Sequence, residues 1–207
     1  MKIFARRTRP CRANFRSRIN PWHLARAART LAAGGIVAHA TEGVWGLACD
    51  PFDELAVKRL LRLKQRSPSH GLILIGAGCE DFRAELAMLD AADREEVVES
   101  WPGAVTYLLP NVQFPEWITG GRDRVAVRVP GHEQARALAA RFGGPVVSTS
   151  LNVSGRPAAR DYLQALNRFP RALFPTSSDY VLPGVVAGRS GPSEIRLPGG
   201  TTLRGAG

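Results

Sequence analysis

The chain has 207 residues and is 44% hydrophobic, which is enough apolar sequence for one compact domain with its own core. Its formal net charge of +10 suggests a nucleic-acid partner, but seven of those charges lie in the first twenty residues, which contain no acid. The rest of the chain keeps a net charge of only +3, so its charge alone does not make it a nucleic-acid-binding domain.

The cysteines and histidines exclude further classes. Three cysteines without a C-x-x-C pair argue against a disulfide framework and for a reduced compartment, and the four scattered histidines predict no structural zinc site. No stretch is apolar enough to span a bilayer, and the acid-free leader lacks the amphipathic period of an organelle transit peptide. We expect a cytoplasmic protein with a flexible basic extension over residues 1–20 and one domain over 21–207.

The first half of that domain alternates helix and strand. Asn20 is a typical N-cap, Pro21 suits the first helical position, and apolar residues at helical spacing continue to Gly34, where the helix is expected to stop. There follow, in order, expected strands over 36–40 and 44–49, a helix from Asp53 to about residue 64, and a buried strand over 72–75.

The second half continues the alternation. It contains expected helices within 80–100, strands over 105–109 and 125–129, a helix over 133–142, a strand over 146–149, a helix over 161–168, and short β-like pieces near the end. The fold class that this order predicts is α/β, with an open, twisted, mixed sheet flanked by helices in a single domain. In such sheets, ligands gather where strands end.

Lysine is rare in this chain and therefore informative. Of 28 basic residues only Lys2, Lys58 and Lys64 are lysines, so a lysine marks a place where a compact ammonium suits better than a planar guanidinium. Lys64 begins the triplet Lys64-Gln65-Arg66, which suits the binding of phosphate oxygens. The alternative is that Lys64 only closes the preceding helix, and the residues alone leave these two interpretations about equal.

Further polar residues stand at strand ends. Ser150 and Asn152 leave the 146–149 strand, although a hydroxyl-rich turn before Gly155 is the commoner explanation of such a stretch. Thr41 and Glu42 carry the same ambiguity. Arg128 lies in an apolar strand, where a charge must pair or face a ligand such as a carboxylate.

Several common signatures are missing. The chain contains no Gly-Lys dipeptide, so it has no P-loop, and Asp81 stands where a dinucleotide fingerprint beginning at Gly76 needs its third glycine. Ser154 lacks the G-x-S-x-G context of a serine hydrolase.

Seven motifs follow one another along the chain from about Pro21 to its end. They are Thr41-Glu42 with Val44-Trp45-Gly46, Lys64-x-Arg66, Trp101-Pro102-Gly103, Val125-Ala126-Val127-Arg128, Ser150-x-Asn152 with Ser154-Gly155, Pro192-Ser193-Glu194-Ile195-Arg196 and Leu203-Arg204-x-Gly205. Together, and in this order, they resemble one family, the threonylcarbamoyl-AMP synthases (YrdC/TsaC/Sua5), and most of all its short bacterial form.

This resemblance implies a YrdC-like (DHBP-synthase-like) fold and a nucleotidyltransferase that makes L-threonylcarbamoyladenylate and pyrophosphate from L-threonine, bicarbonate and ATP. A partner transferase complex then modifies adenosine 37 of ANN-decoding tRNAs. Mg²⁺ accompanies ATP, no organic cofactor is expected, the metal ligands stay unknown, and direct tRNA binding is weak. The resemblance implies catalytic roles for Lys64, Arg66, Ser150 and Asn152. It implies that these four residues also bind ATP, together with His70, Arg160 and Arg204. It implies threonine binding by Thr41, Arg128 and Ser193.

The chain departs from the family at four positions. Ala40 replaces a proline, Gly43 a hydroxyl residue, Trp45 a tyrosine and Ser67 a proline, which changes the expected threonine-side wall but removes no charge. The main rival interpretation is a double-stranded RNA or tRNA-binding module without catalysis, and a carbamoyl-transfer domain is a second. We predict that Lys64→Ala costs far more activity than stability.

Overall fold

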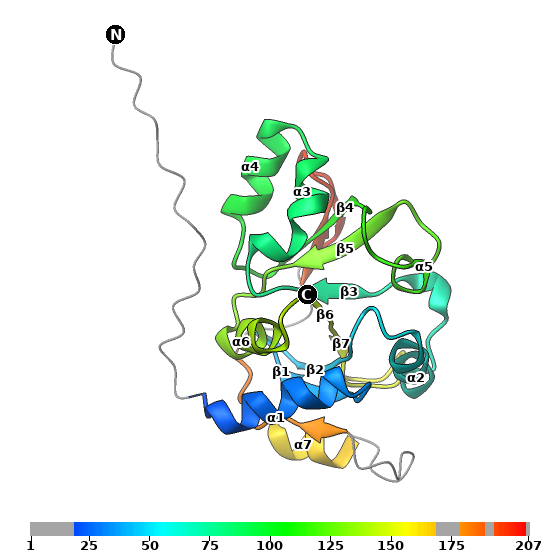
Figure 1. The fold of residues 1–207 in the computed structure, drawn as a ribbon, viewed down its shortest axis with the longest axis vertical. Helices are drawn as coiled ribbons and strands as arrows, with labels where there is room; N and C mark the ends of the chain where they lie inside the picture. Colours follow the sequence, from blue (N-terminus) through cyan, green and yellow to red (C-terminus); the bar gives the residue numbers. More distant parts are fainter. Residues whose placement is uncertain (1–18, 169–178, 189–192, 206–207) are drawn as a thin grey trace.

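The computed structural model describes residues 19–168, 179–188 and 193–205 (Figure 1). Nearly all of the predicted basic extension lies outside these residues, so its flexibility stays a prediction. The helices are α1 (Pro21–Ala32), α2 (Glu54–Lys64), α3 (Arg83–Ala87), α4 (Ala91–Glu99), α5 (Glu116–Thr119), α6 (Glu133–Phe142) and α7 (Tyr162–Arg168), with two short 3₁₀ turns, Pro68–His70 and Cys79–Phe82. None of the helices in the described ranges is long and apolar enough to cross a membrane.

The strands form two mixed sheets. The smaller has the order β7-β2-β1-β8, and the larger has the order β10-β9-β4-β5-β3-β6. Their bounds are β1 (Val37–Ala40), β2 (Trp45–Ala48), β3 (Ile73–Ile75), β4 (Val105–Pro110), β5 (Arg124–Arg128), β6 (Val146–Val147), β7 (Thr149–Ser150), β8 (Tyr180–Val181), β9 (Glu194–Arg196) and β10 (Thr202–Arg204). The mixed α/β class is confirmed, and its strands are divided between two sheets.

One stretch of chain joins the two sheets. β6 pairs with β3 of the larger sheet, and β7, one residue later, pairs with β2 of the smaller sheet. Ser148 lies at the change of sheet, where its backbone N–H donates to the Ile73 carbonyl at 2.8 Å. The predicted strand over 146–149 is therefore one segment shared by two sheets, and it carries the serines that follow into the space between them.

Helix boundaries follow the capping residues. The Asn20 side chain accepts from the Trp22 N–H at the start of α1, and Asp53 accepts from the Ala56 N–H at the start of α2. α2 ends as Gln65 adopts a left-handed conformation with φ 49°, which turns the chain directly after Lys64. The predicted helices over these ranges are confirmed, whereas α5 was not predicted.

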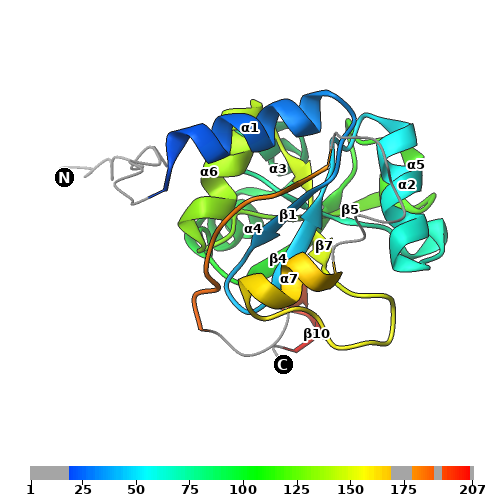
Figure 2. The same ribbon diagram turned by 90° about the horizontal axis from the view of Figure 1, so that it is seen from below.

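The helices cover the outer faces of the sheets. α3 and α4 lie beside the larger sheet, and α1 and α7 lie on either side of the smaller one (Figures 1 and 2). The main hydrophobic cluster includes Trp45, Phe82 and Tyr107, all fully buried, and a second cluster around Leu31 and Leu138 fills the space between α1 and α6. Both sheets are thus backed by buried apolar side chains.

Candidate active site

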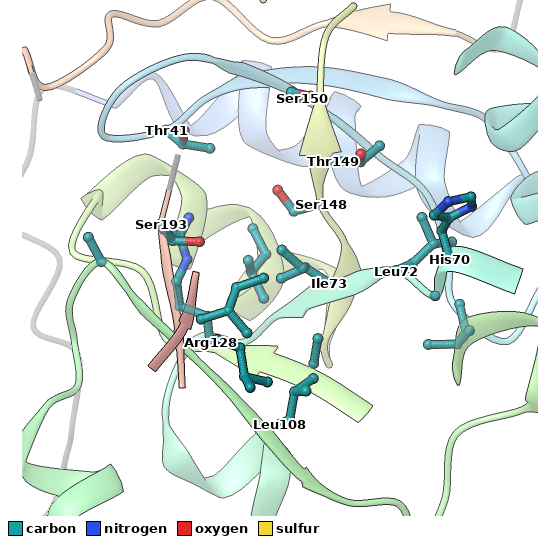
Figure 3. Close-up of a pocket in the computed structure, with 18 of the residues that line it drawn as sticks. Thr41, His70, Leu72, Ile73, Leu108, Arg128, Ser148, Thr149, Ser150 and Ser193 are labelled. Atoms are coloured by element: carbon teal, nitrogen blue, oxygen red, sulfur yellow. The ribbon is translucent and has the colours of Figure 1, made fainter. Parts of the chain in front are cut away.

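A cavity of about 390 Å³ lies between the two sheets (Figure 3). Thr41, Arg128 and Ser193 stand at one end of it and His70 at the other, with Ser148 between them. Among the residues that the structure describes, its charged lining side chains are four arginines and one carboxylate: Arg66, Arg122, Arg124, Arg128 and Glu42. The cavity therefore favours anions, and its volume falls in the usual range for small-molecule sites.

Lys64, the last residue of α2, reaches across to the segment after β7. Its Nζ donates to the Ser150 carbonyl, to Ser150 Oγ at 3.3 Å, and to the carbonyl and Oδ1 of Asn152, both at 2.9 Å. The Ser154 N–H and hydroxyl both donate to the Lys64 carbonyl at 3.0 Å. The two segments predicted to form one site are thus in direct contact, although 86 residues separate Lys64 from Ser150.

The contacts of Lys64 describe more than a helix cap. The residue is only 2% exposed. Its ammonium bonds to Ser150 and Asn152, in and just after β7 of the smaller sheet, and not to the carbonyls of its own helix. Burial, and then repulsion from Arg66, lower the pKa of Lys64 to about 8. The oxygen acceptors oppose that shift because they favour the protonated form.

Arg66 and His70, two predicted site residues, lie at the end of the cavity away from Arg128. The Arg66 guanidinium lines it and donates to the carbonyls of Gly71 at 2.9 Å and His70 at 3.4 Å. These bonds hold Arg66 against the 3₁₀ turn that ends at His70, whose side chain is exposed and also lines the cavity. Ser150 lines the cavity as well, whereas Lys64 and Asn152 contact Ser150 but are not among the lining residues.

Arg128, at the end of β5, is buried at the opposite end. Its Nη2 lies 3.2 Å from Glu42 Oε2, while Glu42 Oε1 accepts from the Gly131 N–H at 2.7 Å. The buried charge predicted to pair or face a ligand is therefore paired with Glu42, and Arg128 also lines the cavity. Thr41, which donates to the Val44 carbonyl at 2.7 Å, stands beside Glu42.

Two serine hydroxyls also line the cavity, one beside Arg128 and one between the two ends. Ser193 Oγ lies 2.8 Å from Thr106 Oγ1, which anchors it beside Arg128 (Figure 3). Ser148 is buried, with its Oγ 3.3 Å from His39 Nε2. Thr41, Arg128 and Ser193 are therefore brought together as predicted.

Besides Lys64 and Asn152, two more predicted residues are not among those that line the cavity. Arg160 is exposed and does not line it, although its backbone N–H is held by Gln164 at 3.1 Å. The backbone of Arg204 belongs to β10, next to Leu203, which does line the cavity, but the position of the Arg204 side chain is not described. Their ATP-binding roles stay predictions.

The structure adds lining residues that were not singled out from the sequence. Arg124, Ala126 and Arg128 alternate along β5, and all three line the cavity. The two-residue period of a strand places such residues on one face, so the position of Arg128 could have indicated Arg124. Ser148 was part of a noted hydroxyl-rich stretch, whereas Arg122 lies outside any regular element and no periodic signal marks it.

No group of three or more histidine, cysteine or carboxylate side chains within the described part of the chain is arranged to hold a metal ion. Glu42, the carboxylate of the cavity, is engaged by Arg128 and Gly131. Mg²⁺ commonly binds through substrate phosphates and water with few protein ligands, so this lining is compatible with Mg²⁺ that arrives on a nucleotide.

Comparison with known proteins decides the family. The family model Sua5_yciO_yrdC, described as "Telomere recombination", matches residues 29–196. Threonylcarbamoyl-AMP synthase of Nitrosococcus oceani is 45% identical over 84% of this chain and 92% of its own. The chain belongs to the Sua5/YciO/YrdC family. The Stutzerimonas stutzeri threonylcarbamoyl-AMP synthase, a second relative in this family, is 45% identical over 91% of this chain and all of its own.

Solved structures of this family share the fold. Sua5 of P. abyssi, crystallised with L-threonine, superimposes with a TM-score of 0.80 at 29% identity over 92% of this chain and 56% of its own. E. coli YciO gives a TM-score of 0.74 at 19% identity over 91% of this chain and 92% of its own. The Sua5/YciO/YrdC fold predicted from the motifs is therefore confirmed.

Proposed function

We propose that this protein is a threonylcarbamoyl-AMP synthase, which joins L-threonine, bicarbonate and ATP into L-threonylcarbamoyladenylate and releases pyrophosphate and water. Relatives of matching length that carry this name support the proposal. The observation that carries it is the cavity between the sheets, with an arginine-rich lining and an ion-paired Arg128 at one end.

The reaction explains why such a cavity is needed. The threonine nitrogen first forms a carbamate, and a carbamate oxygen then attacks the α-phosphorus of ATP, so one anion must approach another. Fixed positive charge lowers that repulsion and stabilises the departing pyrophosphate. The required contribution is positioning and charge, and no side-chain nucleophile takes part.

At the nucleotide end, we assign Arg66, His70 and Ser150 to direct contact with phosphate or ribose oxygens. Lys64 supplies charge close behind Ser150 and, with Asn152, fixes the loop that presents the Ser150 hydroxyl. Arg160 and Arg204 are further candidates for ATP contacts because their motifs match the family. Mg²⁺ enters as part of the MgATP substrate.

At the other end, the Arg128 guanidinium faces the threonine carboxylate, with Thr41 and Ser193 beside it. Glu42, which also lines the cavity, pairs with Arg128 and orients its guanidinium fork. The product would pass in the cytoplasm to a transferase complex that modifies adenosine 37 of ANN-decoding tRNAs.

Pyrophosphate release tests the proposal. Purified protein is incubated with ATP, L-threonine and bicarbonate, and then with each component omitted in turn. Release should require all three, and release that does not depend on threonine would refute the proposal. A module that only binds RNA would release no pyrophosphate but would shift tRNA in a gel, and deletion of residues 1–19 should then abolish that shift.

A further inference from the structure

His39 lies behind the cavity and is fully buried, in β1. Its Nδ1 is 3.2 Å from the Ala40 carbonyl oxygen, and its Nε2 is 3.3 Å from Ser148 Oγ. Because a carbonyl oxygen only accepts hydrogen bonds, the proton of the neutral ring must be on Nδ1. Nε2 is then an acceptor, and the Ser148 hydroxyl must donate to it.

The surroundings keep this ring neutral. Burial is the main reason that the pKa of His39 falls to about 4, and nearby His132 and Arg128 lower it further, while the Ala40 carbonyl and Glu42 oppose them. Protonation would place a donor against the donating Ser148 hydroxyl. At neutral pH the ring is therefore a fixed hydrogen-bond acceptor and not a general base.

Gly46, on the neighbouring strand β2, makes the contact possible. A Cβ at this position would lie 3.1 Å from His39 Nε2, 3.4 Å from Ser148 Oγ and 3.2 Å from the Thr149 carbonyl. These are tight separations, so a side chain at this position would require the neighbouring atoms to move by a few tenths of an ångström. The three residues thus form a compact unit at the wall of the cavity.

We propose that His39 is a positioning residue that fixes Ser148 as a hydrogen-bond acceptor for the nitrogen of the amino-acid substrate. With its own proton committed to His39, Ser148 Oγ offers only lone pairs to the cavity that it lines. The substrate nitrogen keeps at least one N–H as an ammonium, an amine and a carbamate, so one acceptor serves all three states. Ser148 lies between Arg128, which is assigned to the substrate carboxylate, and the nucleotide end, toward which the substrate nitrogen must point.

Kinetics of matched variants test this inference, which rests on the proposed function. His39→Phe removes the acceptor and should raise the KM for threonine about tenfold while the KM for ATP stays within about twofold, since one well-placed hydrogen bond is worth about 1.4 kcal/mol. Ser148→Ala should do the same, and the double variant should be no worse than Ser148→Ala alone. His39→Gln, which restores an acceptor, should recover most of the loss.

Other outcomes overturn the inference. Additive effects, or equal rises in both KM values with a lower melting temperature, would make His39 a structural residue. An unchanged threonine KM in an active His39→Phe protein would remove its positioning role and leave the proposed function standing. His23→Phe, a histidine of α1 bonded to Tyr180 and not lining the cavity, is the control and should change neither KM.

A measurement on the unmodified protein does not depend on how the variants fold. In ¹⁵N NMR of histidine-labelled protein, His39 should be neutral with its proton on Nδ1 from about pH 5.5 to 8. A protonated ring, or a proton on Nε2, would overturn the hydrogen-bond assignment. If the wild type shows no threonine-dependent pyrophosphate release, the proposed function fails, and this measurement still judges the hydrogen bonds.

Discussion

The two ends of the cavity handle positive charge differently. At one end, Lys64 is held by the oxygens of Ser150 and Asn152, all of them uncharged acceptors. At the other end, Arg128 faces the carboxylate of Glu42 at 3.2 Å. The positive charge of Lys64 is therefore not neutralised by a carboxylate. The charge of Arg128 is neutralised by Glu42, which also fixes the direction of the guanidinium fork.

This difference matches the two proposed substrates. A triphosphate carries several negative charges and needs uncompensated cations, whereas threonine is a zwitterion and needs orientation more than charge. The cations at both ends are buried, and burial of a charge is costly without partners. The partners that offset the cost of burial are neutral oxygens around Lys64 and a carboxylate beside Arg128.

Removal of the Lys64 charge should have the strongest effect. Lys64→Met keeps the length of the side chain and should lower pyrophosphate release about 10²- to 10³-fold, as is typical when a preorganised electrostatic group is lost. Lys64→Ala is a poorer test than the sequence suggested, because it adds a cavity to the loss of the donor that both variants share. Steady-state rates and melting temperatures of both variants measure the two effects.

Lys58 provides the matched control on the same helix. It is exposed and forms an i,i+4 pair with Glu54 at 2.6 Å, so Lys58→Met should change the rate less than about twofold and the stability by less than about 1 kcal/mol. Equal rates for the two methionine variants would assign Lys64 to a structural role alone.

Arg128→Lys should act on the threonine end only. The substitution keeps a cation beside Glu42 but removes the bidentate fork, so we expect the KM for threonine to rise about 10- to 100-fold, with the KM for ATP nearly constant. Substrate titrations at saturating ATP give the answer. A comparable rise in the KM for ATP would mean that the two ends do not act separately.

The pH dependence should follow Lys64. Its pKa is lowered to about 8, so kcat/KM for ATP should fall as pH rises through that value, and Lys64→Met should lack this decline. Stability should move the other way, because between about pH 8 and the ordinary value of 10.5 the unfolded chain binds the extra proton. A melting temperature that falls in parallel with activity would attribute the decline to unfolding instead.

A change remote from both ends should affect neither. Asn20→Ala removes the side-chain cap of α1, where Oδ1 accepts from the Trp22 N–H at 2.9 Å, and should cost about 1 kcal/mol of unfolding free energy. Denaturant titration gives that value. Both KM values should stay the same, and a shift in either would show that α1 is coupled to the cavity.

Local signals predicted most of the elements. Caps such as Asn20 and Asp53, and apolar periodicity, gave α1, α2 and the buried strands within one or two residues. They did not predict the division into two sheets, because the change of pairing partner at Ser148 depends on β2 and β3, which are distant in sequence. The short α5 helix lacks a complete apolar period and was also not predicted.

The candidate site could be predicted only in part from the sequence, for a similar reason. The motif pattern named Lys64, Ser150 and Asn152, but the hydrogen bonds between them, and the Glu42 partner of Arg128, are tertiary contacts. His39 gave no signal, since a histidine in an apolar strand resembles any buried polar residue until its neighbours are known. Its role depends on Gly46 and Ser148, which come from two other strands.

The incorporation of labelled bicarbonate tests most directly whether the cavity joins the three substrates. Wild-type protein is incubated with ¹³C-bicarbonate, ATP and L-threonine, and the nucleotide products are separated by mass spectrometry. We predict a threonylcarbamoyl-adenylate that carries the label, with its yield strongly reduced in Lys64→Met and unchanged in Lys58→Met. Absence of the labelled adduct from the folded wild-type protein would contradict the proposed function.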